Sequence, residues 1–261
     1  MSVIHSIEKG QFFFHHSRDE KFPESSVTMH AHVENEIFYF LRGRGNMVVE
    51  GNPYELHEGQ VLIMRSHEFH KPEISQALPY ERMVVQFTEE YIHPFDERGI
   101  LTAPFSQRPL GRWNAFDSDV VKRSLLPQLF RRLSESSEQG EEEQPLSCSI
   151  YTLAILDEIK QLFSKKKEDP EQANSTVVQQ VITYIEENLN QKISLDLLQK
   201  EFFINKFHLN RMFQTATGST VGEYIIMKRL LLARKFIRMG YIPMSACSAS
   251  GFGDYSSFYR A

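Results

Sequence analysis

The stretch Phe-Phe-Ile-Asn-Lys-Phe-His-Leu-Asn-Arg-Met-Phe, residues 202–213, decides the fold of the C-terminal part of this chain. Apolar residues recur at helical spacing before it, and they do so again within it until Thr217 and Gly218 end the pattern. Residues 203–205 are too few for anything but a tight turn, and Asn205 has the side chain of a helix N-cap. The stretch predicts two short helices joined by a tight turn, a helix-turn-helix.

The polar residues of the second helix have side chains that suit DNA recognition. In a helix-turn-helix the N-terminal residues of this helix reach base edges in the major groove. Arginine forks onto guanine, asparagine pairs with adenine, and lysine meets phosphate. The candidates, on the face opposite Leu209 and Phe213, are Lys206, Phe207, Asn210 and Arg211. The alternative is a helical hairpin with a solvated polar face.

A second unit of the same kind follows towards the C-terminus. Residues 229–240 predict a long helix, and residues 244–250 predict a short one before the turn at Gly251. A polar helix start then begins at Asp254. The candidate DNA-contacting residues of this unit are Tyr255, Ser256 and Arg260.

Two helix-turn-helix units joined by one long helix resemble the DNA-binding domain of the AraC/XylS family of bacterial transcription regulators. The matching motifs are Ile193-Ser194-Leu195, His208 to Phe213, Gly218, Glu223-Tyr224, Arg229-Leu230 with Ala233, and Gly251-Phe252 followed by Asp254 and Phe258. The resemblance covers roughly residues 175–261. Gln199 and Phe203 depart from it, since the family usually has a small residue and often a glycine there.

The family pattern continues beyond the last residue of this sequence, Ala261. The second unit therefore reads as incomplete, ending inside its recognition helix. Because short isolated helices are marginal in water, we expect this 261-residue form to bind DNA mainly through its first unit, with a shallow salt dependence.

Charge is divided unevenly along the chain. The net charge is −5, but residues from 175 onward hold 10 Lys and Arg against 6 Asp and Glu, a net charge of +4 that leaves −9 for the rest. A basic C-terminal part joined to an acidic N-terminal part is typical of a DNA reader with a separate sensing domain. Two cysteines exclude a disulfide framework, and no stretch is apolar enough for a membrane helix, so we expect a cytoplasmic protein without membrane contact.

The N-terminal part, residues 1–115, reads as short strands and turns. Residues 37–41 and 46–50 flank a glycine-rich turn, which predicts a hairpin, and further short strands follow up to residue 87. Many short strands at regular spacing favour a sandwich or small barrel.

Within this region the pattern H-x-H-x3-E-x6-G is formed by His30, His32, Glu36 and Gly43, and His70 follows later. This resembles the two motifs of the cupin barrel, the usual sensing domain of AraC-type regulators. The resemblance is partial in the second motif.

The resemblance leaves three interpretations of these residues open. Metal-binding cupins hold a divalent metal with two His, a Glu and a later His, which here would be His30, His32, Glu36 and His70. Regulatory cupins commonly bind an organic effector without metal, and then the same four residues and Phe38 would bind it. Phe38 shares strand parity with Glu36 and faces the same interior, as pocket wall or as core. The third interpretation gives these residues structural roles only.

Helical patterns take over after the strands. Residues 116–163 contain two amphipathic helices that form a hairpin, with Leu153 and Leu156 on the apolar face of the second. The family resemblance implies a dimerisation element; the alternative is packing on the chain's own barrel. Residues 164–175 are polar and read as a linker, and residues 176–261 form the DNA-binding domain.

The sequence thus predicts an α+β multidomain protein: a cupin-like β-barrel with a helical hairpin, then an all-α domain with two helix-turn-helix units. We interpret it as a sequence-specific transcription regulator and not an enzyme. Its partners would be double-stranded DNA, a small effector with sugars among the candidates, a second copy of the chain, and RNA polymerase. The rival interpretation is a metal-dependent cupin enzyme with a helical appendage, which leaves the C-terminal third without a role.

Overall fold

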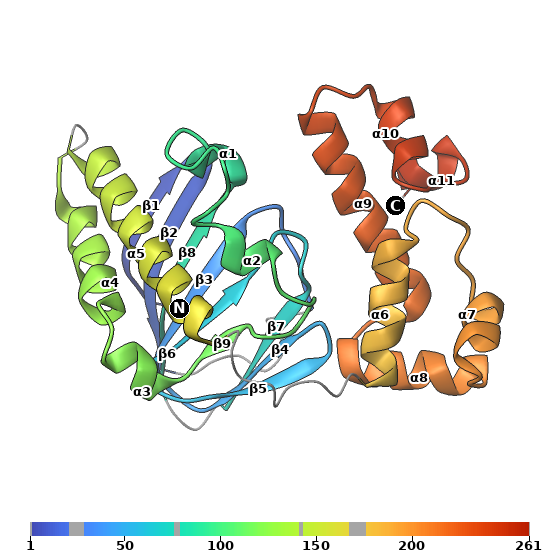
Figure 1. The fold of residues 1–261 in the computed structure, drawn as a ribbon, viewed down its shortest axis with the longest axis horizontal. Helices are drawn as coiled ribbons and strands as arrows, with labels where there is room; N and C mark the ends of the chain where they lie inside the picture. Colours follow the sequence, from blue (N-terminus) through green and yellow to red (C-terminus); the bar gives the residue numbers. More distant parts are fainter. Residues whose placement is uncertain (1, 21–28, 76–78, 141–142, 167–175, 261) are drawn as a thin grey trace.

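The computed structural model describes residues 2–20, 29–75, 79–140, 143–166 and 176–260. Its N-terminal domain is built from two antiparallel sheets (Figure 1). The larger sheet has the strand order β1-β2-β8-β3-β6-β9, and the smaller has the order β5-β4-β7. The strands are β1 (Ser2–Lys9), β2 (Phe12–Asp19), β3 (Asn35–Arg42), β4 (Gly45–Val49), β5 (Asn52–Leu56), β6 (Gln60–Met64), β7 (His70–Ile74), β8 (Tyr80–Phe87) and β9 (Ala115–Phe116).

Strand β3 is buried on both faces, because the two sides of the larger sheet carry separate apolar clusters. Ile37 and Tyr39 point to the outer cluster, where the Tyr39 ring centroid lies 4.9 Å from that of Phe130. Phe38 and Phe40 point the other way, into the barrel interior. Since side chains alternate along a strand, Glu36 shares the interior face with these two phenylalanines.

The helices that follow the barrel cover its outer face. They are α1 (Glu89–Ile92), α2 (Ala103–Ser106), α3 (Ser118–Lys122), α4 (Leu126–Glu135) and α5 (Gln144–Lys166). The hairpin of α4 and α5 packs on its own barrel, and Leu133, Ile155 and Leu156 are buried in the outer cluster. Figure 1 shows this hairpin on one side of the barrel and the C-terminal domain on the opposite side.

The C-terminal domain is entirely helical in its described part. Its helices are α6 (Val177–Glu187), α7 (Leu195–Phe202), α8 (Lys206–Thr217), α9 (Val221–Arg238), α10 (Pro243–Ala249) and α11 (Tyr255–Arg260). Side-chain caps fix several helix starts: Asn205 accepts from Phe207 N and His208 N, and Thr220 forms a capping box with Glu223. Gly218 ends α8 in the left-handed conformation.

The predicted fold class is confirmed: a sheet-rich N-terminal domain precedes a helical domain with two helix-turn-helix units, α7–α8 and α10–α11. The first helix expected within residues 116–163 is divided into α3 and α4, and Pro127 lies in the first turn of α4, where its missing N–H costs no helical hydrogen bond. Of the predicted linker, residues 164–166 continue α5 and the remainder lies outside the described residues. None of the described helices has the length and apolarity needed to cross a membrane.

Candidate effector pocket and DNA-binding surface

Three of the predicted cupin residues meet at the inner face of β3. The ligand atoms of His32, Glu36 and His70 all lie within 4.8 Å of one another. The His32 Nε2 atom is 2.9 Å from Glu36 Oε2, and the His70 Nε2 atom is 3.7 Å from the same oxygen. His30 is not part of this group, although its ring centroid lies 4.4 Å from that of His70.

Backbone contacts fix the orientation of this cluster. His30 and His70 exchange backbone hydrogen bonds, with N to O distances of 3.1 and 2.9 Å. The Nδ1 atom of His70 lies 2.9 Å from the Glu68 carbonyl oxygen, which directs Nε2 inward. Gln86 on β8 stands opposite Glu36 on β3 and donates to Glu36 Oε2 at 2.7 Å.

The electrostatics of the cluster favour an ionised carboxylate. Burial alone would raise the pKa of Glu36, but His70 and His32 outweigh it and hold the pKa well below its usual value. Burial likewise would lower the pKa of His70, but the Glu36 carboxylate outweighs it and raises the pKa. The cluster is therefore a buried anion stabilised by two imidazoles and one amide.

A cavity of about 170 Å³ adjoins the cluster inside the barrel. Its lining residues are His15, His30, Glu36, Phe38, Met47, His70, Pro72, Tyr80, Arg82, Val84 and Gln86. Both ring nitrogens of His15 are buried there without a hydrogen-bond partner among the described residues, whereas the His70 Nε2 atom faces the Glu36 carboxylate at 3.7 Å. Burial, with Arg82 next in weight, lowers the pKa of His15 to about 4, so this imidazole is neutral at pH 7.

Sequence reasoning did not identify His15, Arg82 and Gln86 as site residues. Arg82 and Gln86 share the parity of Tyr80 on β8, so the alternation of that strand was the one available signal. His15 reaches the cavity because β2 pairs with β8, a register that joins residues about 70 positions apart. No local pattern reports such a pairing.

The donor set fits a divalent metal, since two imidazoles and one carboxylate are a common ligand combination. Two contacts would compete with a metal for the same atoms. The Glu34 carbonyl holds Nδ1 of His32 at 2.9 Å, as in many metal sites, but its Nε2 atom is paired with the Glu36 carboxylate. The amide of Gln86 donates to the same carboxylate oxygen that a metal would use.

The cluster is one residue away from the contact between the two domains. Phe69, next to His70, is buried in the apolar core of the C-terminal domain. Its backbone exchanges hydrogen bonds with Glu50, whose side chain pairs with Lys228 on α9 at 2.8 Å and accepts a hydrogen bond from the Tyr224 hydroxyl. Glu50 and Lys228 are both buried, so this ion pair joins the domains away from water.

A second link runs through His67. Its backbone N donates to the His32 carbonyl at 2.8 Å, and its own carbonyl accepts from Lys228 Nζ at 2.7 Å. Glu50 and His67 both have positive φ, 46° and 65°, a conformation that costs a side-chain-bearing residue about 1 kcal/mol or more. The domain contact is therefore made by two strained residues of the barrel.

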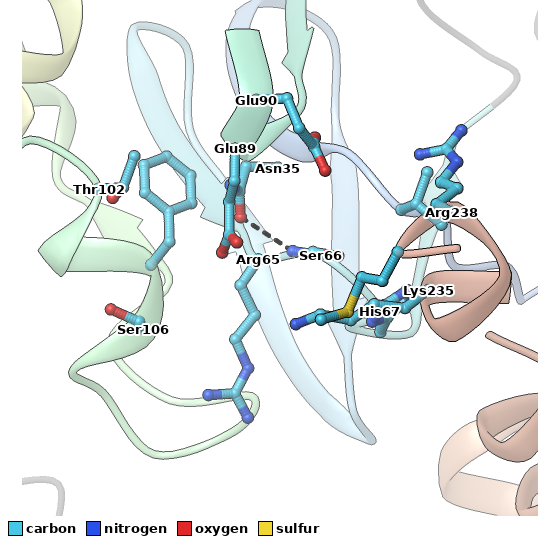
Figure 2. A pocket seen from close by; sticks show the side chains of 13 residues that line it. Asn35, Arg65, Ser66, His67, Glu89, Glu90, Thr102, Ser106, Lys235 and Arg238 are labelled. Atoms are coloured by element: carbon cyan, nitrogen blue, oxygen red, sulfur yellow. Dashed lines mark hydrogen bonds between the residues drawn. The ribbon is translucent and has the colours of Figure 1, made fainter. Parts of the chain in front are cut away.

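A larger cavity, of about 530 Å³, lies between the barrel and α9. Figure 2 shows Arg65, Glu89 and Glu90 from the barrel on one side and Lys235 and Arg238 from α9 on the other. The cavity is separate from the barrel interior, and any molecule bound in it would touch both domains.

The predicted DNA-contacting residues divide into two groups. Phe207, Arg211, Tyr255, Ser256 and Arg260 are exposed, and Lys206 is half-buried beside Asp196, with Nζ 2.7 Å from that carboxylate. Asn210 instead caps α9, because its Oδ1 accepts from Val221 N at 3.0 Å. The Asn210 side-chain oxygen is thus bonded within the fold, whereas the five exposed side chains are open to solvent.

A ligand-sensing barrel joined to two helix-turn-helix units defines a DNA-binding transcription regulator controlled by a small-molecule effector. The family model described as AraC-like ligand binding domain matches residues 17–156, and a helix-turn-helix domain model matches residues 198–261. The chain belongs to the AraC family of transcription regulators.

Individual relatives are distant. The HTH-type transcriptional activator RhaS of Escherichia coli O1:K1 / APEC is 22% identical over 270 residues, which covers 100% of this chain and 93% of RhaS. Among solved structures, ToxT from Vibrio cholerae is 12% identical with a TM-score of 0.38, covering 95% of this chain and 92% of that chain. The AraC-like transcriptional activator CuxR is 15% identical with a TM-score of 0.39, covering 90% and 79%.

Proposed function

We propose that the barrel cavity is the effector site and that it binds a compact, hydroxyl-rich organic molecule of monosaccharide size without a metal. The observation that carries this proposal is the pair of buried His15 ring nitrogens that have no hydrogen-bond partner among the described residues, in a cavity of about 170 Å³. A buried polar atom without a partner costs about 1–3 kcal/mol, which a ligand hydroxyl would recover.

The lining suits a polyol better than an apolar ligand. Glu36 and the Gln86 carbonyl supply acceptors, Arg82 can donate beside its pair with Asp19, and neutral His15 supplies one donor and one acceptor. Sugar hydroxyls both donate and accept, so they can satisfy this mixture. Phe38 and Tyr80 give flat apolar walls against which the C–H face of a sugar ring can pack.

Control of DNA binding would pass through the domain contact. A ligand that shifts His32 or His70 moves residues whose backbones are bonded to His67 and joined to Phe69. His67 and Phe69 in turn hold Lys228 and Glu50. An effector that binds one arrangement of this contact more tightly shifts the population between a joined and a released DNA-binding domain.

The remaining parts of the proposal concern partners. The N-terminal half of α8, with Lys206, Phe207 and Arg211, would enter the major groove, and Tyr255, Ser256 and Arg260 would serve the second unit. Two copies would associate through the exposed apolar residues of α5, and DNA-bound protein would contact RNA polymerase. The protein would act in the cytoplasm, where it meets the chromosome, and would have no catalytic activity.

The test is a thermal-shift and calorimetric screen of the purified chain against monosaccharides, with manganese and zinc alone as separate arms. A sugar at about 100 times its Kd should stabilise the chain by about 2.7 kcal/mol. His15→Ala and Gln86→Ala should each weaken its binding by about ten- to a hundredfold. Glu55→Ala, an exposed change on β5, is the control.

Two results would contradict the effector site. Stoichiometric metal in the purified chain, lost in His70→Ala, would favour the metal interpretation and with it the cupin-enzyme alternative. A ligand that still binds His15→Ala and Gln86→Ala but is lost in Arg65→Ala would lie in the cavity between the domains instead.

A further inference from the structure

Two aromatic side chains stand exposed around the turn of the first helix-turn-helix unit. Phe203 is 92% exposed and Phe207 is 74% exposed. Burying a phenylalanine stabilises a fold by about 1.5–3 kcal/mol, and these two rings contribute almost none of that. Among the described residues, the one ring contact either makes is with Lys206, whose Nζ lies 5.6 Å from the Phe207 ring centroid.

The backbone at Phe203 is also unfavourable for a residue of this type. Phe203 ends α7 with φ 53°, the left-handed conformation that glycine adopts at no steric cost. Compared with glycine, a phenylalanine at this position strains the backbone and exposes an apolar ring to water. The Phe203 ring packs on almost nothing among the described residues. A contact with a partner molecule would explain why a phenylalanine stands here.

The surroundings of the two rings indicate which partner. Arg211 lies one helical turn after Phe207 on the same face of α8, and no carboxylate among the described residues pairs with it. The exposed Lys200 and the half-buried Lys206 flank the turn, and Lys206 is also paired with Asp196 at 2.7 Å. Cations around two exposed rings at the start of a recognition helix complement the phosphates and base edges of DNA, rather than an apolar protein surface.

We propose that Phe207 and Phe203 read thymine, each ring lying against the C5-methyl group of a thymine in the operator. This methyl is the one apolar group that bases present in the major groove, and phenylalanine is a side chain that contacts it. Arg211, on the same face as Phe207, would fork onto a guanine beside the first thymine. The inference rests on the proposed role of α8 in DNA reading and adds the base class that the helix selects.

The test compares thymine with uracil, which lacks only the C5-methyl group. The chain first selects its sites from random duplex DNA, and each thymine of the selected site is then replaced by uracil for fluorescence-anisotropy titrations. We expect wild-type affinity to fall about three- to tenfold at one or two positions. Phe207→Ala should bind the thymine and uracil forms of the first position equally, and Phe203→Gly should do so at the second.

Stability measurements separate this role from a structural one. Phe203→Gly should unfold at the same temperature as the wild type or higher, because the strain is removed, and Phe95→Ala, an exposed phenylalanine of the barrel, should change no preference. Two results would overturn the thymine proposal while leaving α8 as the DNA reader. In the first, the wild type binds uracil and thymine DNA equally tightly. In the second, Phe207→Ala and Phe203→Gly keep the full thymine–uracil difference in affinity. Selection of no sequence, or of sites unchanged by Arg211→Ala, would overturn α8 as the reader and this proposal with it.

Discussion

At the scale of single residues, the buried Glu68–Arg108 pair holds the loop that leads into β7 and His70. Glu68 accepts hydrogen bonds from Arg108, Gly111 N and Arg65 N, with distances of 2.8, 2.7 and 2.9 Å. Both side chains are fully buried. Burial alone would raise the pKa of Glu68, but Arg108 outweighs it and lowers the pKa from 4.5 to about 2.

This pair predicts acid sensitivity. Because the pKa of Glu68 is depressed in the folded state, its contribution, about 3 kcal/mol, is present above about pH 4.5 and is lost as the pH falls towards 2. The double variant Glu68→Gln/Arg108→Met removes both charges. Its free energy of unfolding should therefore fall less than that of the wild type between pH 5 and pH 3. Denaturant titrations at each pH measure this, with Glu55→Gln as the control. A slope as steep as the wild type's would refute the assignment.

Residues also differ in how far their roles could be predicted. His32, Glu36 and His70 were predictable, because their spacing is a motif carried by short segments of the chain. His15 and Gln86 were not, because the β2–β8 and β8–β3 registers that bring them to the pocket are set by tertiary packing. Asn210 stays a predicted DNA contact, but residue type alone did not reveal that its Oδ1 accepts from the backbone N of Val221 at the start of α9.

At the scale of elements, α5 buries one apolar face against the barrel and leaves two large apolar residues exposed. Ile155, Leu156 and Ile159 are buried against the barrel. Leu146 and Ile150, one turn apart, are 66% and 52% exposed. Leu156 is fully buried within its own chain and Leu153 is half-buried, so Leu156 cannot meet a second copy. Helical periodicity identifies an apolar face without saying which surface it meets. The dimerisation role of the hairpin stays a prediction. The exposed pair is the candidate interface.

The double variant Leu146→Asp/Ile150→Asp should therefore be monomeric, because burying two carboxylates in an apolar interface costs several kcal/mol. Its thermal unfolding in the monomer range of concentration should match that of the wild type. Leu156→Asp should instead lose several kcal/mol of stability at any concentration, since that residue is buried within its own chain. Sedimentation that shows the same dimer for Leu146→Asp/Ile150→Asp would assign association to another surface.

At the scale of the whole molecule, the barrel and the DNA-binding domain meet through a buried ion pair. Burial alone lowers the pKa of Lys228, but Glu50 and Glu186 outweigh it and raise the pKa, so the amine stays charged. The turn at Gly51 also lies against Ala216 and Thr217 at the end of α8. The order of the two domains was predictable from the sequence, but this contact was not, because Glu50 and Lys228 belong to no local motif.

Lys228→Met should uncouple the two domains. Removing one partner of a buried pair costs about 3–5 kcal/mol, so Glu50 would be left buried without its cation and the contact should open. We expect calorimetry to show two unfolding transitions instead of one, and DNA affinity to become independent of the effector. Glu50→Gln/Lys228→Met should recover part of the lost stability, and Lys192→Met, an exposed change between α6 and α7, should behave as wild type. A single transition with an intact effector response in Lys228→Met would show that the contact is not the route of control.

The same ion pair limits how freely the two domains can be recombined. A barrel grafted onto a helical domain that lacks an amine at the position of Lys228 would leave Glu50 buried without its cation, and the reciprocal graft onto a barrel that lacks the carboxylate would leave Lys228 without its anion. Chimeras of this protein should therefore inherit their response only when Glu50, Phe69 and Lys228 travel together. The sensing domain and the DNA-binding domain have separate folds, yet they can be exchanged between proteins only together.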